Sequence, residues 1–210
     1  GKSHRTNDTS DMLMFNAEEA GIVVKFEKKD TPQKVNIKLF RQGAKDIRLN
    51  DTKISQKELI GTLNTVIFCP EDLQLIKGTP SGRRRFLDME ISQTSATYYH
   101  QLMQYNRLLQ QRNAVLKEYR GKNTIPLEEW DLQLADMASF IVKKRLESLK
   151  KINLLIDLMN RKLTGGLENL TIGYEQPYMD NGSLEYTKEG FYERIKAALP
   201  QDRHRLSTSV

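Results

Sequence analysis

The side chains most able to do chemistry in this sequence lie in residues 65–88, where an acidic helix start is followed closely by a basic one. Pro70 suits the first position of a helix, and Glu71 and Asp72 would stand in its first turn, where the helix dipole favours negative charge. A second helix start follows, with the arginines 83–85 in the turn where the dipole disfavours positive charge. Three cations placed against the local field predict an anion from outside the helix.

Two interpretations fit the arginine run. As an ordinary helix face, the arginines would be solvated or ion-paired, and Arg84 could reach Asp88 at the i,i+4 spacing. As a functional site, they would contact the phosphates of DNA or of a nucleotide. The site would then comprise Arg83, Arg84 and Arg85, with Lys77 beside them at the end of the preceding helix.

A second group of cations lies on a long helix that we expect from about Leu127 to Thr164. A solvated face is the ordinary interpretation of such a group. The alternative is an arm that follows phosphates, which would give a salt-dependent affinity. No aromatic residues are interleaved with these cations, so base stacking is not indicated. The group consists of Lys143, Lys144, Arg145, Lys150 and Lys151.

The composition is that of an ordinary globular protein with a basic surface. The 210 residues carry a net charge of +6, with 29% charged and 38% hydrophobic residues. This excess favours polyanionic partners such as nucleic acid. Cys69 is the only cysteine, so an internal disulfide is excluded, and we expect a buried thiol in a reducing cytosol. No stretch approaches the roughly 18 apolar residues of a membrane span, so we expect no membrane partner.

Catalytic and metal sites have little support in the sequence. His4, His100 and His204 are far apart and lack cysteines or paired acids at ligand spacing, so no metal site is predicted. No nucleophile–base pair or carboxylate dyad is evident, and we predict no catalytic residue. Residues 1–3 (GKS) end like a phosphate-binding loop, but the leading glycine and the following helix are missing.

The hydrophobic pattern predicts strands first and helices afterwards, which is an α+β fold. Residues 21–50 read as a small antiparallel meander, followed by a short helix over 55–61 and a buried strand over 64–69. From about residue 80, apolar residues recur at spacings of three and four. Two long helices joined by the turn at 120–126 should pack antiparallel and bury their apolar stripes against each other.

Three features break or follow this helical pattern. Arg112 interrupts the apolar stripe of the first long helix, and Gly165 and Gly166 should end the second. Alternating apolar residues over 170–174 then predict a strand, and residues 187–198 predict a helix that Pro200 would close.

The segment FCPEDLQLIKGTPSGRRRFLD resembles the signature of the RecF family of bacterial DNA replication and repair proteins. The stretches GKSHRT, YHQLMQYNRLLQQRNAVLK and LEEWDLQLADMASFIVKKRL are similar to that family too, so the resemblance covers nearly the whole chain. It implies a cytoplasmic ATPase related to the SMC and Rad50 ABC-type heads. Such proteins bind ATP, Mg²⁺ and single- or double-stranded DNA, dimerise with ATP, and act with RecO and RecR to load RecA at single-strand gaps.

The resemblance also implies a domain layout. A partial ABC head would comprise residues 1–95 and the return segment 166–210, and residues 96–165 would form a helical-hairpin arm. The Walker A loop is expected upstream of Gly1, and the signature and Walker B motifs downstream of Val210. We therefore expect an internal fragment that lacks ATPase activity by itself and binds no cofactor tightly.

Some residues acquire roles only through this resemblance. Glu71 stands about where the coupling glutamine of the ABC Q-loop lies, which makes Glu71 and Asp72 candidates for sensing nucleotide or metal, beside a plain helix-start role. His4 and Arg5 follow the nucleotide-binding helix, where relatives approach ATP or DNA. The alternative to a DNA-binding ATPase fragment is a non-enzymatic module whose arm docks a protein such as RecR and does not bind DNA.

Overall fold

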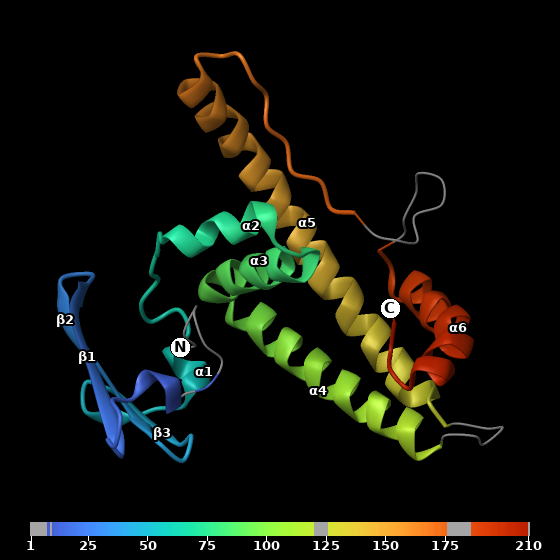
Figure 1. The fold of residues 1–210 in the computed structure, drawn as a ribbon, viewed down its shortest axis with the longest axis horizontal. Helices are drawn as coiled ribbons and strands as arrows, with labels where there is room; N and C mark the ends of the chain where they lie inside the picture. Colours follow the sequence, from blue (N-terminus) through green and yellow to red (C-terminus); the bar gives the residue numbers. More distant parts are fainter. Residues whose placement is uncertain (1–7, 9, 120–125, 176–185, 210) are drawn as a thin grey trace. The chain divides into compact units, whose positions relative to one another are not determined.

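A computed structural model of the chain describes residue 8 and residues 10–119, 126–175 and 186–209. The chain divides into two compact units, Gly1–Ile67 and Phe68–Val210. The first unit is built on an antiparallel sheet, whereas the second is helical (Figure 1). The expected α+β fold class is therefore confirmed.

The first unit contains the predicted meander, in the strand order β1-β2-β3-β4. Val35, Leu39 and Ile47 are buried on one face of the sheet, as their alternation predicts. The hairpin between the first two strands turns at Lys29 and Asp30, which both have positive φ (50° and 60°), as a two-residue hairpin turn requires. The elements of this unit are η1 (Ser10–Met12), β1 (Glu19–Lys28), β2 (Thr31–Phe40), β3 (Lys45–Leu49), β4 (Thr52–Lys53) and α1 (Gln56–Leu59).

The buried strand predicted over residues 64–69 is wrong. These residues form neither helix nor strand, and Val66 and Phe68 are 98% and 94% exposed. An apolar run becomes a strand only where a neighbouring strand accepts its backbone hydrogen bonds. Among the described residues, the ladder pairings involve β1–β4 alone.

The second unit consists of helices that pack around the long helix α5. Its elements are η2 (Pro70–Leu73), α2 (Gln74–Lys77), α3 (Pro80–Thr94), α4 (Ala96–Glu118), α5 (Glu128–Thr164) and α6 (Lys188–Arg205). Gly165 ends α5 in the left-handed conformation (φ 64°), as predicted. No helix formed by the described residues is long and apolar enough to cross a membrane.

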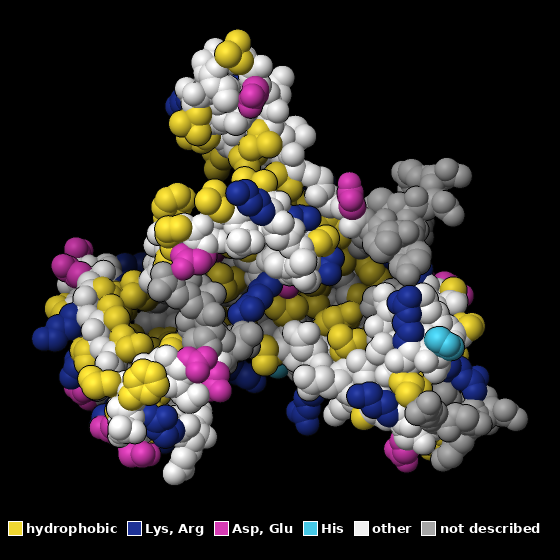
Figure 2. All heavy atoms as spheres, in the orientation of Figure 1, with side chains coloured by type: hydrophobic (Ala, Val, Ile, Leu, Met, Phe, Trp, Pro, Cys, Tyr) yellow, Lys and Arg dark blue, Asp and Glu magenta, His cyan; other side chains and the backbone are white. Residues whose placement is uncertain are grey.

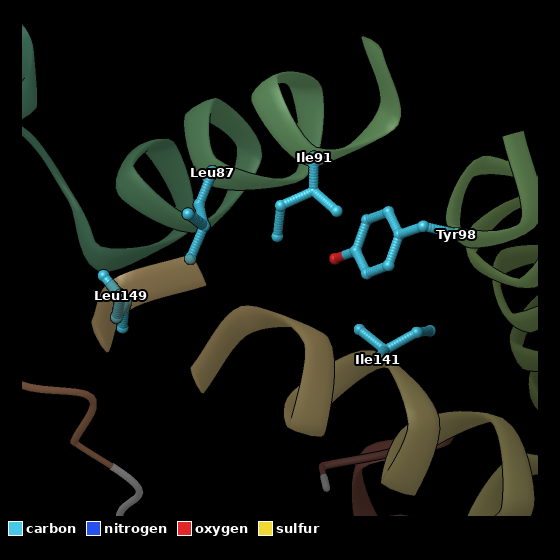
Figure 3. Packing of buried hydrophobic residues seen from close by; sticks show 5 residues of the cluster. All are labelled: Leu87, Ile91, Tyr98, Ile141 and Leu149. Atoms are coloured by element: carbon cyan, nitrogen blue, oxygen red, sulfur yellow. The ribbon is translucent and has the colours of Figure 1, made fainter. Parts of the chain in front are cut away.

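Two neighbouring apolar clusters hold this unit together. In the first, Leu87 and Ile91 of α3 meet Tyr98 of α4 and Ile141 and Leu149 of α5 (Figure 3). In the second, apolar residues of α5 pack against α6: Leu134, Ala135, Val142, Phe191 and Ile195. The long helix thus buries one side under α3 and α4 and the adjacent side under α6.

The two long helices pack antiparallel, but they differ in length. Tyr98 at the start of α4 lies near Ile141, and Arg112 near its end pairs with Asp131 at the start of α5. At 1.5 Å per residue, the 23 residues of α4 span about 35 Å and the 37 residues of α5 about 55 Å. The two helices therefore bury their apolar stripes against each other, as predicted, only along the first half of α5. Leu163, near its end, is 87% exposed.

Arg112, which interrupts the apolar stripe in the sequence, is fully buried at the meeting point of three helices. Its Nε donates to Asp131 of α5 (2.6 Å), and its Nη1 donates to Asp202 of α6 (2.7 Å). The same Nη1 donates to the hydroxyl of Thr208 (2.8 Å), beyond the end of α6. The pKa of Asp131 is raised because burial disfavours its charged form, and Arg112 opposes this shift. One guanidinium therefore joins α4, α5 and the C-terminal segment.

Helix α6 does not end at Pro200 as predicted. Pro200 lies inside the helix, which continues to Arg205. Proline removes one backbone hydrogen bond from a helix interior. The residues after it are held by tertiary contacts, because Asp202 accepts hydrogen bonds from Arg112 and from the backbone and hydroxyl of Ser209.

Residues 170–174 are not a strand, although they are extended. Among the described residues, their backbone groups bond to side chains of α5: Leu170 donates to Asp157 (3.1 Å), and Ile172 donates to Asn153 (2.8 Å). A strand needs a second strand, and here a helix takes its place. Figure 1 shows this segment running back along α5 from the end of the helix.

We predict that the substitution Arg112→Ala destabilises the chain by about 3 to 5 kcal/mol, because it leaves two buried carboxylates without a counter-charge. The loss should shrink as the pH is lowered from 7 to about 5, since Asp131, whose pKa is raised by burial, binds a proton more readily when folded than when unfolded. Urea unfolding followed by circular dichroism measures both effects.

The matched control is Arg107→Ala, which removes an exposed arginine from the same helix and should change the free energy of unfolding by less than about 0.5 kcal/mol. Equal stabilities for the two variants would contradict a structural role for Arg112.

Candidate functional site

The basic helix start is formed as the sequence predicts. The hydroxyl of Thr79 accepts a hydrogen bond from the backbone of Gly82 (3.3 Å), and Pro80 occupies the first turn of α3. The first turn of α3 contains no acidic residue. The arginines that follow therefore face the positive end of the helix dipole without a local counter-charge from that turn.

The three arginines do not share one environment. The guanidinium of Arg83 donates to the carbonyl oxygens of Leu75 (3.3 Å) and Gly78 (2.9 Å), so it satisfies backbone groups around the end of α2. Arg84 and Arg85 are exposed on α3, and Lys77 is exposed at the last position of α2. Arg83 thus donates to the backbone of the chain, although all three arginines are exposed.

Asp88 does not pair with Arg84 as the i,i+4 spacing allows. Its two oxygens accept hydrogen bonds from Nε and Nη2 of Arg145 on α5 (2.7 and 2.8 Å). The hydroxyl of Tyr98 donates to Asp88, and Arg145 also donates to the hydroxyl of Tyr174 (2.9 Å). The ion pair between Asp88 and Arg145 is largely buried, with 13% of the Arg145 side chain and 15% of the Asp88 side chain exposed.

This cluster changes the proton affinity of its members. Burial raises the pKa of Tyr98 above its ordinary value, and the hydrogen bond to Asp88 adds to that increase. Burial by itself lowers the pKa of Arg145, but the hydrogen bonds and the charge of Asp88 outweigh it, so the pKa is raised. The arginine is therefore a fixed cation that joins α3 to α5.

The cations of α5 separate into two faces. At 100° per residue, Arg145 points to the side of the helix that carries Ile141 and Leu149, which are core residues. The four lysines lie on the outward side of α5. Of these, Lys144 forms an ion pair with Glu147 (2.7 Å), and both partners are partly exposed. The remaining exposed lysines of this group are Lys143, Lys150 and Lys151.

The acidic helix start has a local structural role. One oxygen of Asp72 accepts a hydrogen bond from the backbone of Cys69 (2.8 Å), which fixes the start of η2. Glu71 is exposed in the same turn. Burial raises the pKa of the Cys69 thiol, with Glu71 and Asp72 adding to the shift. Within the described part of the chain, no group of three or more His, Cys, Asp or Glu side chains could hold a metal ion.

The other predicted site residues, His4 and Arg5, lie outside the described residues, as does the GKS sequence. The sequence reasoning missed Asp88, Asp131 and Asp202 as partners of buried arginines. The sequence does contain one signal of a buried arginine. Arg112 occupies a position where the apolar spacing of α4 predicts a core residue.

Comparison with known proteins gives consistent results. No family model matches the chain. The DNA replication and repair protein RecF of Clostridium botulinum (strain Eklund 17B / Type B) is 40% identical over 210 residues, which are 100% of this chain and 57% of the relative. The RecF of Alkaliphilus oremlandii (strain OhILAs) is 39% identical over 208 residues, covering 98% of this chain and 57% of the relative.

Solved structures agree with these sequence matches. The recombination mediator protein RecF with ATP in the RecFOR pathway superposes with a TM-score of 0.91 at 30% identity, covering 99% of this chain and 57% of that chain. The corresponding RecF-ATPrS structure superposes with a TM-score of 0.89 at 30% identity, covering 100% and 57%. The chain therefore spans little more than half the length of the proteins it matches.

The two faces of α5 predict opposite effects of removing a cation. Arg145→Ala should destabilise the chain by about 3 kcal/mol, because it leaves Asp88 without its partner in a largely buried position. Lys143→Ala should change the free energy of unfolding by less than about 0.5 kcal/mol. Thermal and urea unfolding of both variants test this difference, which equal stabilities would contradict.

Proposed function

The chain belongs to the RecF family of DNA replication and repair proteins, and we propose that it supplies such a protein with a basic surface that holds DNA phosphates. The relatives are DNA replication and repair proteins by name, and the similar solved structures are those of a recombination mediator protein RecF with ATP or ATPrS. Because this chain spans 57% of their length, the activity of the whole protein is part of the proposal.

The observation that carries the proposal is the placement of exposed cations around one helix contact. Leu87 of α3 and Leu149 of α5 belong to the same buried cluster (Figure 3). Arg84 precedes Leu87 by one turn, and Lys150 follows Leu149 directly, so each of the two helices carries an exposed cation next to its contact residue. Arginine and lysine side chains grouped in this way are suited to the sugar-phosphate backbone, which positions a protein on DNA without reading its sequence.

The proposed DNA-binding residues are chosen by the exposure and the contacts of each cation. Arg83 and Arg145 bind groups of the chain itself, and we assign them the role of holding the surface in place. Phosphate contact is assigned to the exposed cations Lys77, Arg84, Arg85, Lys143, Lys150 and Lys151, with Lys144 at the edge through its pair with Glu147. Single- and double-stranded DNA are both expected to bind, because the phosphates are common to them.

ATP is assigned to the whole protein. One oxygen of Asp72 accepts a hydrogen bond from the backbone of Cys69, which supports a helix-start role for this residue. We propose that the residues gripping ATP and Mg²⁺ lie in the remaining length of the family, with Glu71, His4 and Arg5 approaching the nucleotide from this part. ATP-driven dimerisation, cooperation with RecO and RecR, and RecA loading in the cytoplasm would then belong to the full-length protein.

We predict that the double variant Arg84→Ala/Arg85→Ala weakens DNA binding at all sequences alike. It should also reduce the slope of log K against log salt by about 2, because two fewer phosphates are neutralised by the protein. Fluorescence anisotropy with a labelled duplex and a labelled single strand of equal length, over a salt series, measures both quantities.

The control is Lys188→Ala/Lys196→Ala, which removes two exposed cations from α6 and should leave the slope unchanged. If the intact chain binds no DNA at low salt, the rival function gains support, namely a non-enzymatic module that docks a protein such as RecR.

A second prediction concerns catalysis. The 210-residue chain should hydrolyse ATP no faster than buffer with Mg²⁺, whereas a full-length RecF relative assayed in parallel should turn over. Phosphate release measured over hours tests this. Hydrolysis by the chain that depends on Mg²⁺ and is lost in Glu71→Gln would overturn the assignment of the ATP site to the rest of the protein.

A further inference from the structure

The helix α4 carries no acidic side chain until its last residue. The chain contains no aspartate or glutamate between Glu90 and Glu118, and Glu118 is the residue at which α4 ends. Acids make up 27 of the 210 residues, or about one in eight, so a stretch of this length would on average include about three. An anionic partner can therefore approach α4 along nearly its whole length without repulsion from the helix itself.

Arg107 lies at the centre of the outward face of α4. At 3.6 residues per turn it points to the side of the helix opposite Leu116, which is fully buried. Residues three and four apart on a helix are neighbours, so Gln104 lies beside Arg107 on the preceding turn, and Gln110 and Gln111 lie beside it on the following turn. All four side chains are exposed. The outward face is thus one guanidinium surrounded by three amides.

The rest of the chain does not engage these side chains. Within the described residues, Arg107, Gln110 and Gln111 form no hydrogen bond or ion pair, and Gln104 contacts the ring of His100 (3.4 Å). The helix packs mainly against α5 and α3, which cover its other side (Figure 1). Figure 2 shows that the surface along α4 is mainly uncharged, with basic side chains interspersed. The donors of the outward face are therefore available to a ligand.

Guanidinium and amide groups together suit the sugar-phosphate backbone of DNA. Phosphate and sugar oxygens accept hydrogen bonds from arginine and from glutamine side chains, and such contacts place a protein on DNA without reading its sequence. A guanidinium neutralises a phosphate, whereas an amide donates to it without adding charge. At 1.5 Å per residue α4 spans about 35 Å, which is close to one turn of a duplex. A face that lacks acids over this length matches a partner that is negative throughout, rather than a short acidic peptide.

The outward face of α4 also lies near the cations already assigned to DNA. Tyr105 of α4 packs against both apolar clusters of the helical unit. Burial raises the pKa of Tyr105, and the charges of Arg145, Arg112 and Arg84 oppose that increase. Arg84 at the start of α3 is therefore close enough to the middle of α4 for its charge to act there.

We propose that the outward face of α4 binds the sugar-phosphate backbone of DNA, with Arg107 on a phosphate and Gln104, Gln110 and Gln111 hydrogen-bonded to the oxygens beside it. The inference rests on the proposed DNA binding and adds to it a surface of a different kind. The amides release no counterions, so their share of the binding free energy persists when salt weakens the contribution of the lysines and arginines.

The test separates the amides from the cations by the salt dependence of binding. Gln104→Ala/Gln111→Ala should weaken the binding of a labelled duplex about tenfold and leave the slope of log K against log salt unchanged, because hydrogen bonds are lost and no charge is removed. Arg107→Ala should weaken binding and also reduce the slope by about 1. The matched control is Gln133→Ala/Gln201→Ala, which removes two exposed amides from α5 and α6 and should change neither quantity.

A second readout uses the unchanged chain and does not depend on the folding of any variant. In a nuclear magnetic resonance titration with the same duplex, the side-chain amide signals of Gln104, Gln110 and Gln111 should shift, and that of Gln201 should not. Unmoved signals on α4, or Gln104→Ala/Gln111→Ala binding as tightly as the control, would overturn the inference. If Arg84→Ala/Arg85→Ala nevertheless weakens binding, the proposed function stands without it, whereas an unchanged chain that binds no DNA overturns both.

Discussion

The helical unit depends on the buried contact of Arg112 with two carboxylates. Burying an arginine is costly, and a buried ion pair is tolerated only when nearly every donor and acceptor is matched. Here Asp131 and Asp202 come from different helices, so the charge of the guanidinium is balanced only when α4, α5 and α6 are all in place, although its buried Nη2 has no hydrogen-bond partner among the described residues. The apolar clusters would accept small shifts of one helix against another, whereas the charge contact would not. It therefore defines which of the many possible apolar packings is adopted.

A second buried arginine extends the same logic to α3. Arg145 holds Asp88, and through it the helix that carries Arg84 and Arg85 at its start. The orientation of the exposed cations thus depends on cations that are not exposed. A basic cluster in a sequence can contain both buried and exposed cations, because every lysine or arginine adds the same charge wherever it lies in the fold. Burial distinguishes Arg145, which joins two helices, from the exposed cations of the same group.

The far half of α5 uses hydrogen bonding in an unusual way. Asn153, Asp157 and Asn160 present amide and carboxylate groups at intervals close to those of a strand edge, and they stabilise an extended segment that pairs with no strand among the described residues. The alternation over residues 170–174 predicts a strand, whereas the structure has an extended segment bonded to a helix. A strand prediction assumes a strand partner, and the three polar side chains of α5 are spaced like any other polar helix face.

The sequence by itself determined the meander, the two long helices, the glycine that ends α5 and the resemblance to the RecF family. Each of these depends on residues close in the chain or on a contiguous motif, whose preferences are expressed locally. Tertiary structure alone decided that Arg112 and Arg145 are buried, that Pro200 lies within a helix and that Val66 and Phe68 are exposed. Asp202 lies 90 residues from the arginine it neutralises and Asp88 lies 57 from its own, so no local pattern could identify either pair. The free energy of a charge depends on which groups surround it, and folding is what brings those groups together.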